Sequence, residues 1–397
     1  MTEMYDVIVV GSGPGGASAA YFLSAGGKSV LVLEKETLPR YKTCGGGLSL
    51  RFLQEQFPFS FDSVLSSDVK ALSYAYGDYS ITIPIQKGVI GMVMRDKLDA
   101  HILEHARAEV HQGCAVQRVQ ETGQGVIVET RDGQRFEGRY LIGADGANST
   151  IAHSLGLRKK RRLAAAIEVE APVPENVWRR YARRPVFIFG EVRLGYLWIF
   201  PKGDHLSVGI AALRPKRGEL QATLQQVMRR YGIQLDGSTM HGHPIPIYRG
   251  RERIATKRVL LVGDAAGLAD PLSGEGIRYA IKSGRLASQA ILSGHPERYA
   301  ALVRRQIGWN HTFALYAALL FYHLDWLCLA LGAPNPFTTH AIMDLLSDRT
   351  GTINVVLRGV FTFPIFIATE TLAILVSLLG GPEKAKRIRE KVYAHKV

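Results

Sequence analysis

Cysteine is scarce in this sequence of 397 residues, which contains only Cys44, Cys114 and Cys328. Three cysteines give no plausible disulfide framework in a chain this long, which favours a reducing compartment. The opening residues, MTEMYDVIVVGSG, also lack the charged segment and the cleavage site of a secretory signal. We therefore expect a cytoplasmic protein.

Metal and nucleic-acid signatures are also missing. His241 and His243 have no partner ligands at metal-site spacing, so we interpret both as structural and expect no metal ion. No nucleic-acid recognition module is present, which argues against a nucleic-acid partner.

The composition that remains is that of a globular protein with an anionic partner. The chain is 47% hydrophobic, contains 41 glycines and carries a net charge of +14, and it is long enough for two or three folded units. A basic protein of this kind attracts a phosphate-bearing ligand or an anionic lipid surface. Two basic runs, 158–162 and 178–184, are either solvated charges or a site for a diphosphate or a phospholipid headgroup.

A nucleotide-binding fingerprint opens the chain. The apolar run Val7 to Val10 predicts a buried parallel strand, residues 17–25 predict a helix, and Val30 to Leu33 predict a second strand. Gly11, Gly13 and Gly16 lie between the first strand and the helix, in the spacing that lets backbone amides approach a pyrophosphate. Glu34 ends the second strand, where a carboxylate can accept hydrogen bonds from an adenosine ribose.

Two later segments favour a flavin over a nicotinamide cofactor. Residues 139–150 read as a short strand that runs into a turn with Asp145, and residues 257–292 read as a strand, a glycine-rich loop and a helix. Asp264 could hydrogen-bond a polyhydroxylated chain, and the amides around Gly274, Gly276 and Ile277 could stabilise negative charge on a reduced ring. A nicotinamide enzyme needs no such third segment.

These segments resemble the flavoprotein group that includes p-hydroxybenzoate hydroxylase. The resemblance implies FAD, with Glu34 on the ribose, Asp264 on the ribityl and pyrophosphate region and Arg95 near the pyrophosphate, while Asp99 supports the helix that follows Arg95. The full expected cofactor set is Gly11, Gly13, Pro14, Gly15, Gly16, Glu34, Lys35, Arg95, Asp145, Gly263, Asp264, Gly274, Gly276 and Ile277.

Two further motifs resemble the geranylgeranyl reductase family. The first contains Pro39, Tyr41, Cys44, Gly45 and Gly46, with the proline one residue closer to the tyrosine than the family pattern has it. The second is the Y-x-W-x-F-P element, formed by Tyr196, Trp198, Phe200 and Pro201. The family pattern then expects G-x-G, whereas this chain has Gly209, Ile210 and Ala211.

The family resemblance implies reduction of alkenes in a prenyl chain. Reduced FAD would deliver hydride, and Cys44 or Tyr41 would line the reacting face beside the bare backbone of Gly45 and Gly46. Alternation puts Tyr196, Trp198 and Phe200 on one strand face, which we interpret as a wall of the lipid site, although the same pattern also suits a core strand. Since the chain has a single dinucleotide fingerprint, the electron donor is either NAD(P)H without its own domain or reduced ferredoxin, an acidic electron carrier.

The expected fold class is α/β, with a Rossmann-like FAD-binding domain, an inserted antiparallel substrate-binding sheet and a C-terminal helical region. We assign the FAD-binding domain to residues 1–69, 95–164 and 257–300, the substrate-binding sheet to 70–94 and 165–256, and the lipid- or membrane-associated helices to 301–397.

The C-terminal region combines apolar runs with a basic tail. Residues 359–381 are long enough to span a bilayer, but Glu370 near the middle is costly in hydrocarbon. This favours helices that cover a greasy pocket or lie in a membrane surface. Residues 384–396 carry six Lys or Arg against one Glu, so we expect peripheral association with an anionic membrane.

Two other functions fit parts of the sequence. An FAD-dependent aromatic monooxygenase or halogenase would share the flavin segments, although the W-x-W-x-I element of halogenases is absent from the sequence. A non-enzymatic lipid carrier on an ancestral flavin fold would not need those segments intact.

Overall fold

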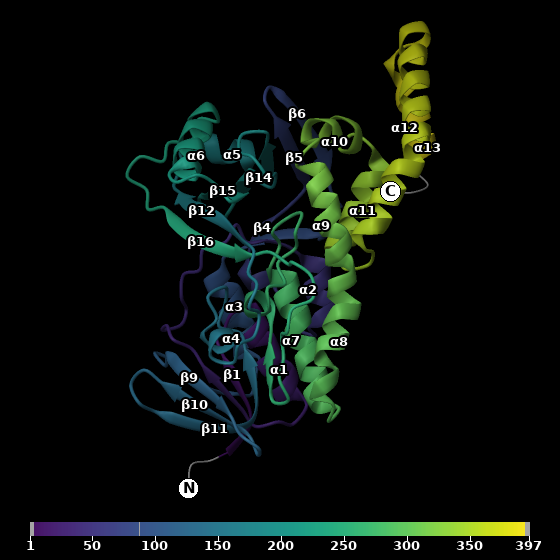
Figure 1. The fold of residues 1–397 in the computed structure, drawn as a ribbon. Coiled ribbons are helices and arrows are strands. Elements are labelled where there is room, and N and C mark those ends of the chain that lie inside the picture. Colours follow the sequence, from purple (N-terminus) through teal and green to yellow (C-terminus); the bar gives the residue numbers. More distant parts are fainter. Residues whose placement is uncertain (1–3, 87, 394–397) are drawn as a thin grey trace.

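The computed structural model describes residues 4–86 and 88–393, and two seven-stranded sheets organise it (Figure 1). The first sheet has the order β8-β2-β1-β11-β10-β9, with β17 paired to β11. Its strands are β1 (Met4–Val10), β2 (Val30–Leu33), β8 (Glu109–His111), β9 (Val116–Glu121), β10 (Val126–Thr130), β11 (Arg135–Gly143) and β17 (Val259–Leu261). Strands β8, β2, β1, β11 and β17 run parallel, and β9 and β10 add an antiparallel edge.

Helices α1 (Pro14–Ala25) and α7 (Ile277–Leu292) pack together on this sheet, with α3 (Arg95–Glu104) beside α1. The contact between α1 and α7 is close because a Cβ atom on Gly284 would lie 2.4 Å from the carbonyl oxygen of Gly15. This packing brings the start of α7 to the glycine loop, at the carboxyl ends of the parallel strands, where α/β folds bind their ligands.

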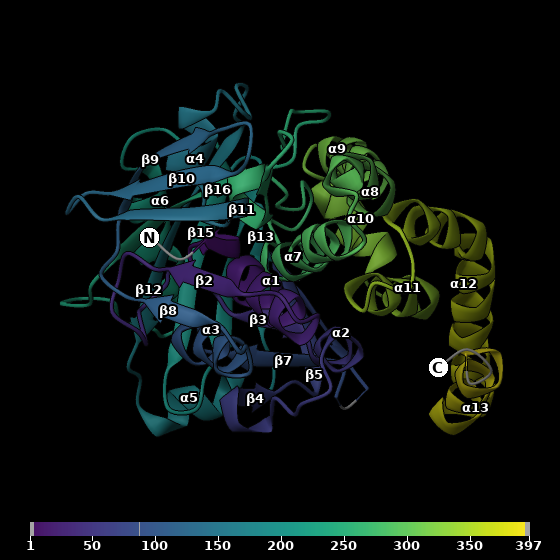
Figure 2. The same cartoon turned by 90° about the horizontal axis from the view of Figure 1, so that it is seen from below.

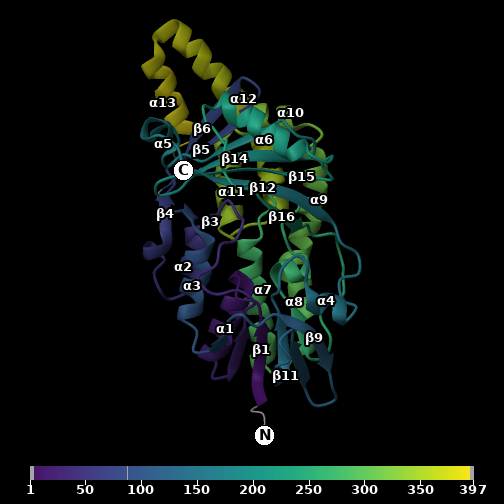
Figure 3. The same ribbon diagram turned by 90° about the vertical axis from the view of Figure 1, so that its left-hand side faces the viewer.

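The second sheet faces those carboxyl ends and has the order β16-β12-β15-β14-β13-β5-β6 (Figures 1 and 3). Its strands are β5 (Ala71–Tyr76), β6 (Tyr79–Pro84), β12 (Leu163–Ala171), β13 (Val186–Phe189), β14 (Gly195–Pro201), β15 (Leu206–Leu213) and β16 (His241–Pro246). Helix α6 (Glu219–Arg230) covers its outer face with Leu224, Val227 and Met228, and α5 (Glu175–Tyr181) lies beside it.

Two details of the predicted sheet are wrong. Strand β13 pairs with β5 in parallel, so the sheet is mixed rather than purely antiparallel. Strand β7 (Ile90–Val93), expected in this sheet, instead lies between β3 (Gly47–Ser49) and β4 (Leu65–Asp68) in a separate three-stranded sheet. All four β7 residues are buried, because β7 is the central strand of this small sheet.

Short helices α2 (Leu50–Gln56) and α4 (Thr150–Ser154) connect these parts, and the chain from α7 onward is helical. The C-terminal helices are α8 (Tyr299–Val303), α9 (Trp309–Phe321), α10 (Asp325–Gly332), α11 (Pro336–Leu346), α12 (Thr352–Gly380) and α13 (Pro382–Tyr393). The apolar run at 313–332 is therefore broken between α9 and α10, at the polar residues His323 and Asp325. Helices α12 and α13 project from the body in both views (Figures 1 and 2).

Candidate active site

The glycine loop after β1 has the shape of a phosphate cradle. Gly11 has φ +95°, and a Cβ atom there would lie 2.4 Å from the carbonyl oxygen of Ala144. A Cβ on Gly16 would lie 1.9 Å from the carbonyl oxygen of Gly11. Helix α1 begins with Pro14 and its N-cap, Gly13, provides no side-chain hydrogen bond, so the first amides remain available to an anion.

Glu34 is a buried carboxylate at the end of β2. Its Oε2 accepts hydrogen bonds from the backbone N–H and the hydroxyl of Ser12, at 2.8 and 2.6 Å, and lies 3.5 Å from Nε of Arg40. Burial opposes ionisation, but the Ser12 hydrogen bonds and the charge of Arg40 hold the pKa of Glu34 below its ordinary value. The side chain of Lys35, by contrast, is 70% exposed and lies 3.5 Å from Glu36, so the structure does not bring it into the site.

Arg95 begins α3 and points toward the glycine loop. Its Nε and Nη2 donate to Asp99 at 2.9 and 2.8 Å, which fixes a charge-assisted, two-point pair. A Cβ on Gly13 would lie 3.9 Å from Nη2 of Arg95 and 3.7 Å from Nη2 of Arg40. Two guanidinium groups therefore face the cradle, and sequence analysis found only Arg95.

The segments after β11 and β17 lie beside this cradle. Oδ2 of Asp145 accepts from the N–H of Ile151, while its buried Oδ1 has no hydrogen-bond partner among the described residues. Asp264 lies in the short turn Gly263–Ala266, and a Cβ on Gly276 would be 3.3 Å from its Oδ1. Burial raises the pKa of Asp264, against the opposing charges of Lys42 and Arg95.

These residues fit FAD. An unpartnered carboxylate oxygen at Asp145, uncapped helix starts at Gly13 and Gly276, and two guanidinium groups suit a ligand with hydroxyls and a pyrophosphate. Gly274, with φ +70°, precedes Ile277 at the first turn of α7. The structure therefore gathers the expected cofactor residues, apart from the side chain of Lys35, around the carboxyl ends of the parallel strands.

The Cys-Gly-Gly turn packs directly on the aromatic strand. A Cβ on Gly45 would lie 2.9 Å from the ring of Phe200 and 3.1 Å from Nε1 of Trp198. Gly46 has φ +64°, and a Cβ there would lie 2.0 Å from the carbonyl oxygen of Val93. The two motifs that are distant in sequence thus form one surface, and each glycine is required by a contact.

The aromatic residues of β14 share a face, as their alternation predicts. Trp198 and Phe200 lie in one apolar cluster with Tyr196 against it, whereas Leu197 and Ile199 lie in another. The hydroxyl of Tyr196 donates to the carbonyl oxygen of Ser273 at 2.6 Å, which ties the strand to the loop before Gly274. Pro201 is buried at the end of the strand.

The missing second glycine of the G-x-G element has a structural explanation. Gly209 is needed, because a Cβ there would lie 2.1 Å from the Trp198 ring. Ala211 is buried in the apolar cluster of the aromatic face, where its methyl group packs instead of leaving the backbone bare.

Sequence analysis missed two buried charges at this turn. Lys202 donates from Nζ to the carbonyl oxygens of Gly45 and Val93 at 2.7 and 2.8 Å, and burial lowers its pKa. The side chain of Glu168 is fully buried and accepts from the backbone N–H of Cys44 at 2.5 Å. The signal for Glu168 was a pair of glutamates, Glu168 and Glu170, in the otherwise apolar stretch of residues 163–171.

The two histidines interpreted as structural lie at the rim of the site. The ring of His241 lies 4.5 Å from that of Tyr41, and Nε2 of His243 is 2.5 Å from Nζ of Lys42. Burial and Arg95 lower the pKa of Lys42 to about 8, and burial and Lys42 lower the pKa of His243 to about 4. No cluster of metal ligands occurs among residues 4–86 and 88–393.

Helices from the C-terminal region cover the aromatic face. Met343 of α11 belongs to the same cluster as Trp198 and Phe200. The hydroxyl of Tyr322 donates to the carbonyl oxygen of Leu272 at 2.7 Å, and the ring of Phe321 packs against Phe189. These contacts form an apolar roof over the aromatic face.

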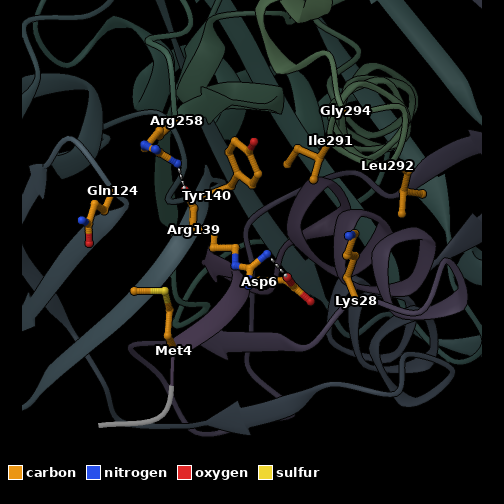
Figure 4. Close-up of a pocket in the computed structure, with 10 residues that line it drawn as sticks. All are labelled: Met4, Asp6, Lys28, Gln124, Arg139, Tyr140, Arg258, Ile291, Leu292 and Gly294. Atoms are coloured by element: carbon orange, nitrogen blue, oxygen red, sulfur yellow. Dashed lines mark hydrogen bonds and ion pairs between the residues drawn. The ribbon is translucent and has the colours of Figure 1, made fainter. Parts of the chain in front are cut away.

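A cavity of about 440 Å³ lies elsewhere, between Met4, Asp6, Lys28, Arg139 and Leu292 (Figure 4). It is at the amino end of β1, whereas the glycine loop follows the carboxyl end of that strand (Figure 1). Its position separates it from the site.

Models of FAD binding domains match residues 6–76 and 90–292. Among curated relatives, a geranylgeranyl diphosphate reductase of Rhodobacter capsulatus is 30% identical, covering 73% of this chain and 75% of its own length. A menaquinone reductase of Mycolicibacterium smegmatis is 28% identical, covering 76% of this chain and 80% of its own length. An uncharacterized protein of Methanosarcina barkeri is 33% identical over 81% of this chain and 84% of its own.

Solved structures agree on the fold. A geranylgeranyl bacteriochlorophyll reductase-like protein of Thermoplasma acidophilum has a TM-score of 0.76 at 24% identity, covering 90% of this chain and 96% of its own. A flavin-dependent brominase has a TM-score of 0.70 at 20% identity, covering 87% and 94%. The fold is thus shared with flavin enzymes of other activities. The sequence relatives of this chain and the residues that fit FAD place it in the geranylgeranyl reductase family of FAD-dependent oxidoreductases.

Proposed function

We propose that this enzyme saturates carbon–carbon double bonds in a prenyl chain carried by a lipid, a diphosphate or a quinone. The observation that carries the proposal is the contact between the Cys-Gly-Gly turn and the aromatic face of β14, under the roof of α9 and α11. An aromatic and aliphatic surface binds a prenyl chain through buried area, without polar contacts.

The residues of the site would orient the alkene and exclude water. When bound, reduced FAD supplies the hydride, and its difficult chemistry belongs to the cofactor. Trp198 and Phe200 form the buried aromatic face, Gly45 lets the Cys-Gly-Gly turn pack on that face, and Met343 of α11 covers it. Cys44 and Tyr41 stand at the same turn, where one group must donate a proton to the second alkene carbon.

The test is anaerobic turnover of the purified holoenzyme. We expect the pre-reduced protein, mixed with geranylgeranyl diphosphate or a prenyl quinone, to give products heavier by one H2 for each saturated bond in mass spectrometry. Oxygen uptake driven by an aromatic substrate, with no saturated prenyl product, would instead establish a monooxygenase. A protein that binds no flavin would favour the lipid carrier.

The proposal extends to an acidic electron carrier as donor, with NAD(P)H as the alternative. A basic depression of about 400 Å³ lies behind the turn at Gly263–Ala266, lined by Lys160, Arg161, Arg249, Arg251 and Arg304, with Glu252 and Glu297. Arg158 of the run 158–162 is buried and donates to the carbonyl oxygens of Ala265 and Ala147, so only its neighbours remain exposed.

Charge reversal tests this donor site. If a reduced ferredoxin docks there, Arg161→Glu and Arg251→Glu should slow flavin reduction by ferredoxin, and added salt should slow the wild type, because exposed charges are screened. Reduction by dithionite serves as the control. Equal rates in variant and wild type would exclude this surface, and efficient reduction by NADPH alone would favour the other donor.

We further propose peripheral attachment to the inner face of an anionic membrane through α12 and α13. Within the described residues, α12 contains one stretch, Thr352–Leu379, long and apolar enough to cross a membrane, with a mean hydropathy of 1.9. Its side chains are largely exposed, with Leu378 and Leu379 at 78% and 89%. The basic helix α13 follows directly, although residues 394–396 of the predicted basic tail lie outside the described part.

A further inference from the structure

The structure contains a line of titratable groups that leads from solvent to the Cys-Gly-Gly turn. We infer that Glu168, Glu170 and His205 supply protons to the hydroxyl of Tyr41, which donates to the alkene. This inference rests on the proposed alkene reduction, because each saturated bond consumes one proton.

The inner end of the line is Glu168, whose contacts are all with the active-site turn or its neighbouring strand. Its Oε2 accepts from the hydroxyl of Tyr41 at 3.3 Å and from the backbone N–H of Cys44 at 2.5 Å. Its Oε1 accepts from the hydroxyl of Ser207. Burial of a carboxylate is costly unless it has hydrogen-bond partners, and these three groups are the partners of Glu168. Glu168 therefore lies where a proton for Tyr41 is needed.

The outer end reaches water. Glu170 lies two residues after Glu168 and therefore on the same face of β12. Its Oε2 is 2.7 Å from Nε2 of His205, an ion-pair distance without the angle of a hydrogen bond, and their side chains are 23% and 21% exposed. Nδ1 of His205 lies 2.6 Å from Asp204, which is 91% exposed.

Burial and the neighbouring groups together raise the pKa of Glu168. The groups that face Glu168 are Tyr41 and Cys44 from the turn, Glu170 on its own strand, Ser207 and His205 from the β15 side, Lys202 from the β14 side and His241 of β16. Burial and Glu170 raise the pKa of Glu168, against the Ser207 and Cys44 hydrogen bonds and the charge of Lys202.

The two ends show the same tendency. The neighbouring Glu170 and Asp204 raise the pKa of His205 against its burial. Burial and the charges of Glu168 and Glu170 raise the pKa of Tyr41, so its hydroxyl keeps its proton at neutral pH. Glu168, His205 and Tyr41 therefore each hold a proton more tightly than they would in water.

The proton transfers balance for each bond. One alkene carbon receives the hydride and the other takes the proton of the Tyr41 hydroxyl, forming a C–H bond as the O–H bond breaks. The Tyr41 oxygen then takes the proton of the Glu168 carboxyl. Glu168 regains a proton from solvent through Glu170 and His205, so the net uptake is one solvent proton per bond.

The test compares three variants, Glu168→Gln, His205→Gln and Tyr41→Phe, with a control variant, Glu191→Gln. Glu191 is far from the turn in sequence, and its carboxylate pairs with Arg230. In anaerobic single turnovers of the pre-reduced holoenzyme, we expect Glu168→Gln and Tyr41→Phe to slow saturation about 100-fold or more. Flavin content and reoxidation by dioxygen should stay at wild-type levels. His205→Gln should lose activity more steeply as pH rises and regain it with added imidazole, whereas Glu191→Gln should match the wild type.

A second readout does not depend on turnover. Infrared difference spectra of wild type against Glu168→Gln should contain the carbonyl band of a protonated carboxyl that persists above about pH 4.3, the ordinary glutamate range. Wild-type saturation rates in Glu168→Gln or Tyr41→Phe would overturn the relay while leaving the proposed function intact. If Glu168→Gln fails to fold, an unchanged pH profile in His205→Gln would overturn it. If the wild type saturates no prenyl substrate, the proposed function fails, and the infrared band alone then decides whether Glu168 holds a proton.

Discussion

The active-site turn depends on single glycines whose replacement has distinct, separable costs. Gly46 combines a left-handed backbone with close neighbours. Gly77 has φ +55°, and no atom of the described part of the chain lies within 4 Å of the place that an added methyl group would occupy. Substitutions at the two positions therefore distinguish the cost of backbone strain from the cost of steric overlap.

We predict that Gly46→Ala destabilises the protein more than Gly77→Ala. Both substitutions cost about 1–2 kcal/mol for the left-handed conformation, but the first also displaces the carbonyl of Val93 and Nζ of Lys202, at 2.0 and 2.6 Å from the new methyl. Thermal unfolding and FAD stoichiometry would measure this. Equal losses in the two variants would contradict the close packing of the turn.

Acid sensitivity should arise in part from His243. Burial and the charge of Lys42, whose own pKa is about 8, lower the pKa of His243 from 6.5 to about 4. The unfolded chain therefore binds this proton first, so stability falls as pH drops from about 6.5 to 4, by at most about 3 kcal/mol. Denaturant unfolding of the apoprotein at several pH values should show a flatter profile for His243→Gln. The exposed His153 provides the control substitution, and parallel profiles for wild type and His243→Gln would refute the assignment.

Among the elements, a buried arginine joins the roof over the aromatic face to α7. Arg278, in the first turn of α7, pairs with Glu275 at 2.8 Å and donates to the carbonyl oxygen of Leu345 at 2.7 Å. It also lies 3.3 Å from Asp348, which Lys282 contacts as well. The start of the cofactor-side helix and the end of α11 are thus joined.

We predict that Arg278→Met loosens this joint. Removing one partner of a buried ion pair costs about 3–5 kcal/mol, so amides at 337–348 should exchange hydrogen faster. Arg285→Met, on an exposed position of the same helix where the arginine contacts Gln56, is the matched control. Unchanged exchange at 337–348 in Arg278→Met would show that the roof is held by its apolar contacts alone.

For the whole molecule, the exposed apolar α12 and basic α13 predict binding to anionic vesicles. Each basic residue near an anionic surface contributes about 1 kcal/mol, so reversing Lys384, Lys386 and Arg387 to Glu should weaken cosedimentation about 100-fold or more. Reversal of Arg179, Arg180 and Arg183, in or beside α5, should have little effect. A wild type that stays in the supernatant, or that binds neutral vesicles equally well, would contradict the proposed attachment.

Much of the fold followed from local patterns. The strand Val30–Leu33 and the helix that ends at Ala25 agree with the structure because apolar runs and glycine spacing act over short distances. The sequence could not show that Ile90–Val93 belongs to a third sheet, because a strand buried on both faces has no polar–apolar alternation that indicates its partner.

The sequence by itself determined the nucleotide cradle and the aromatic face, since each depends on residues adjacent or alternating along the chain. Only the tertiary structure decided that Gly45 rests on Phe200, that Lys202 holds the carbonyl of Gly45 and that Glu168 lies under Cys44. These contacts join residues far apart in sequence. A buried charge can be identified only when the structure shows the partners that offset the cost of its burial.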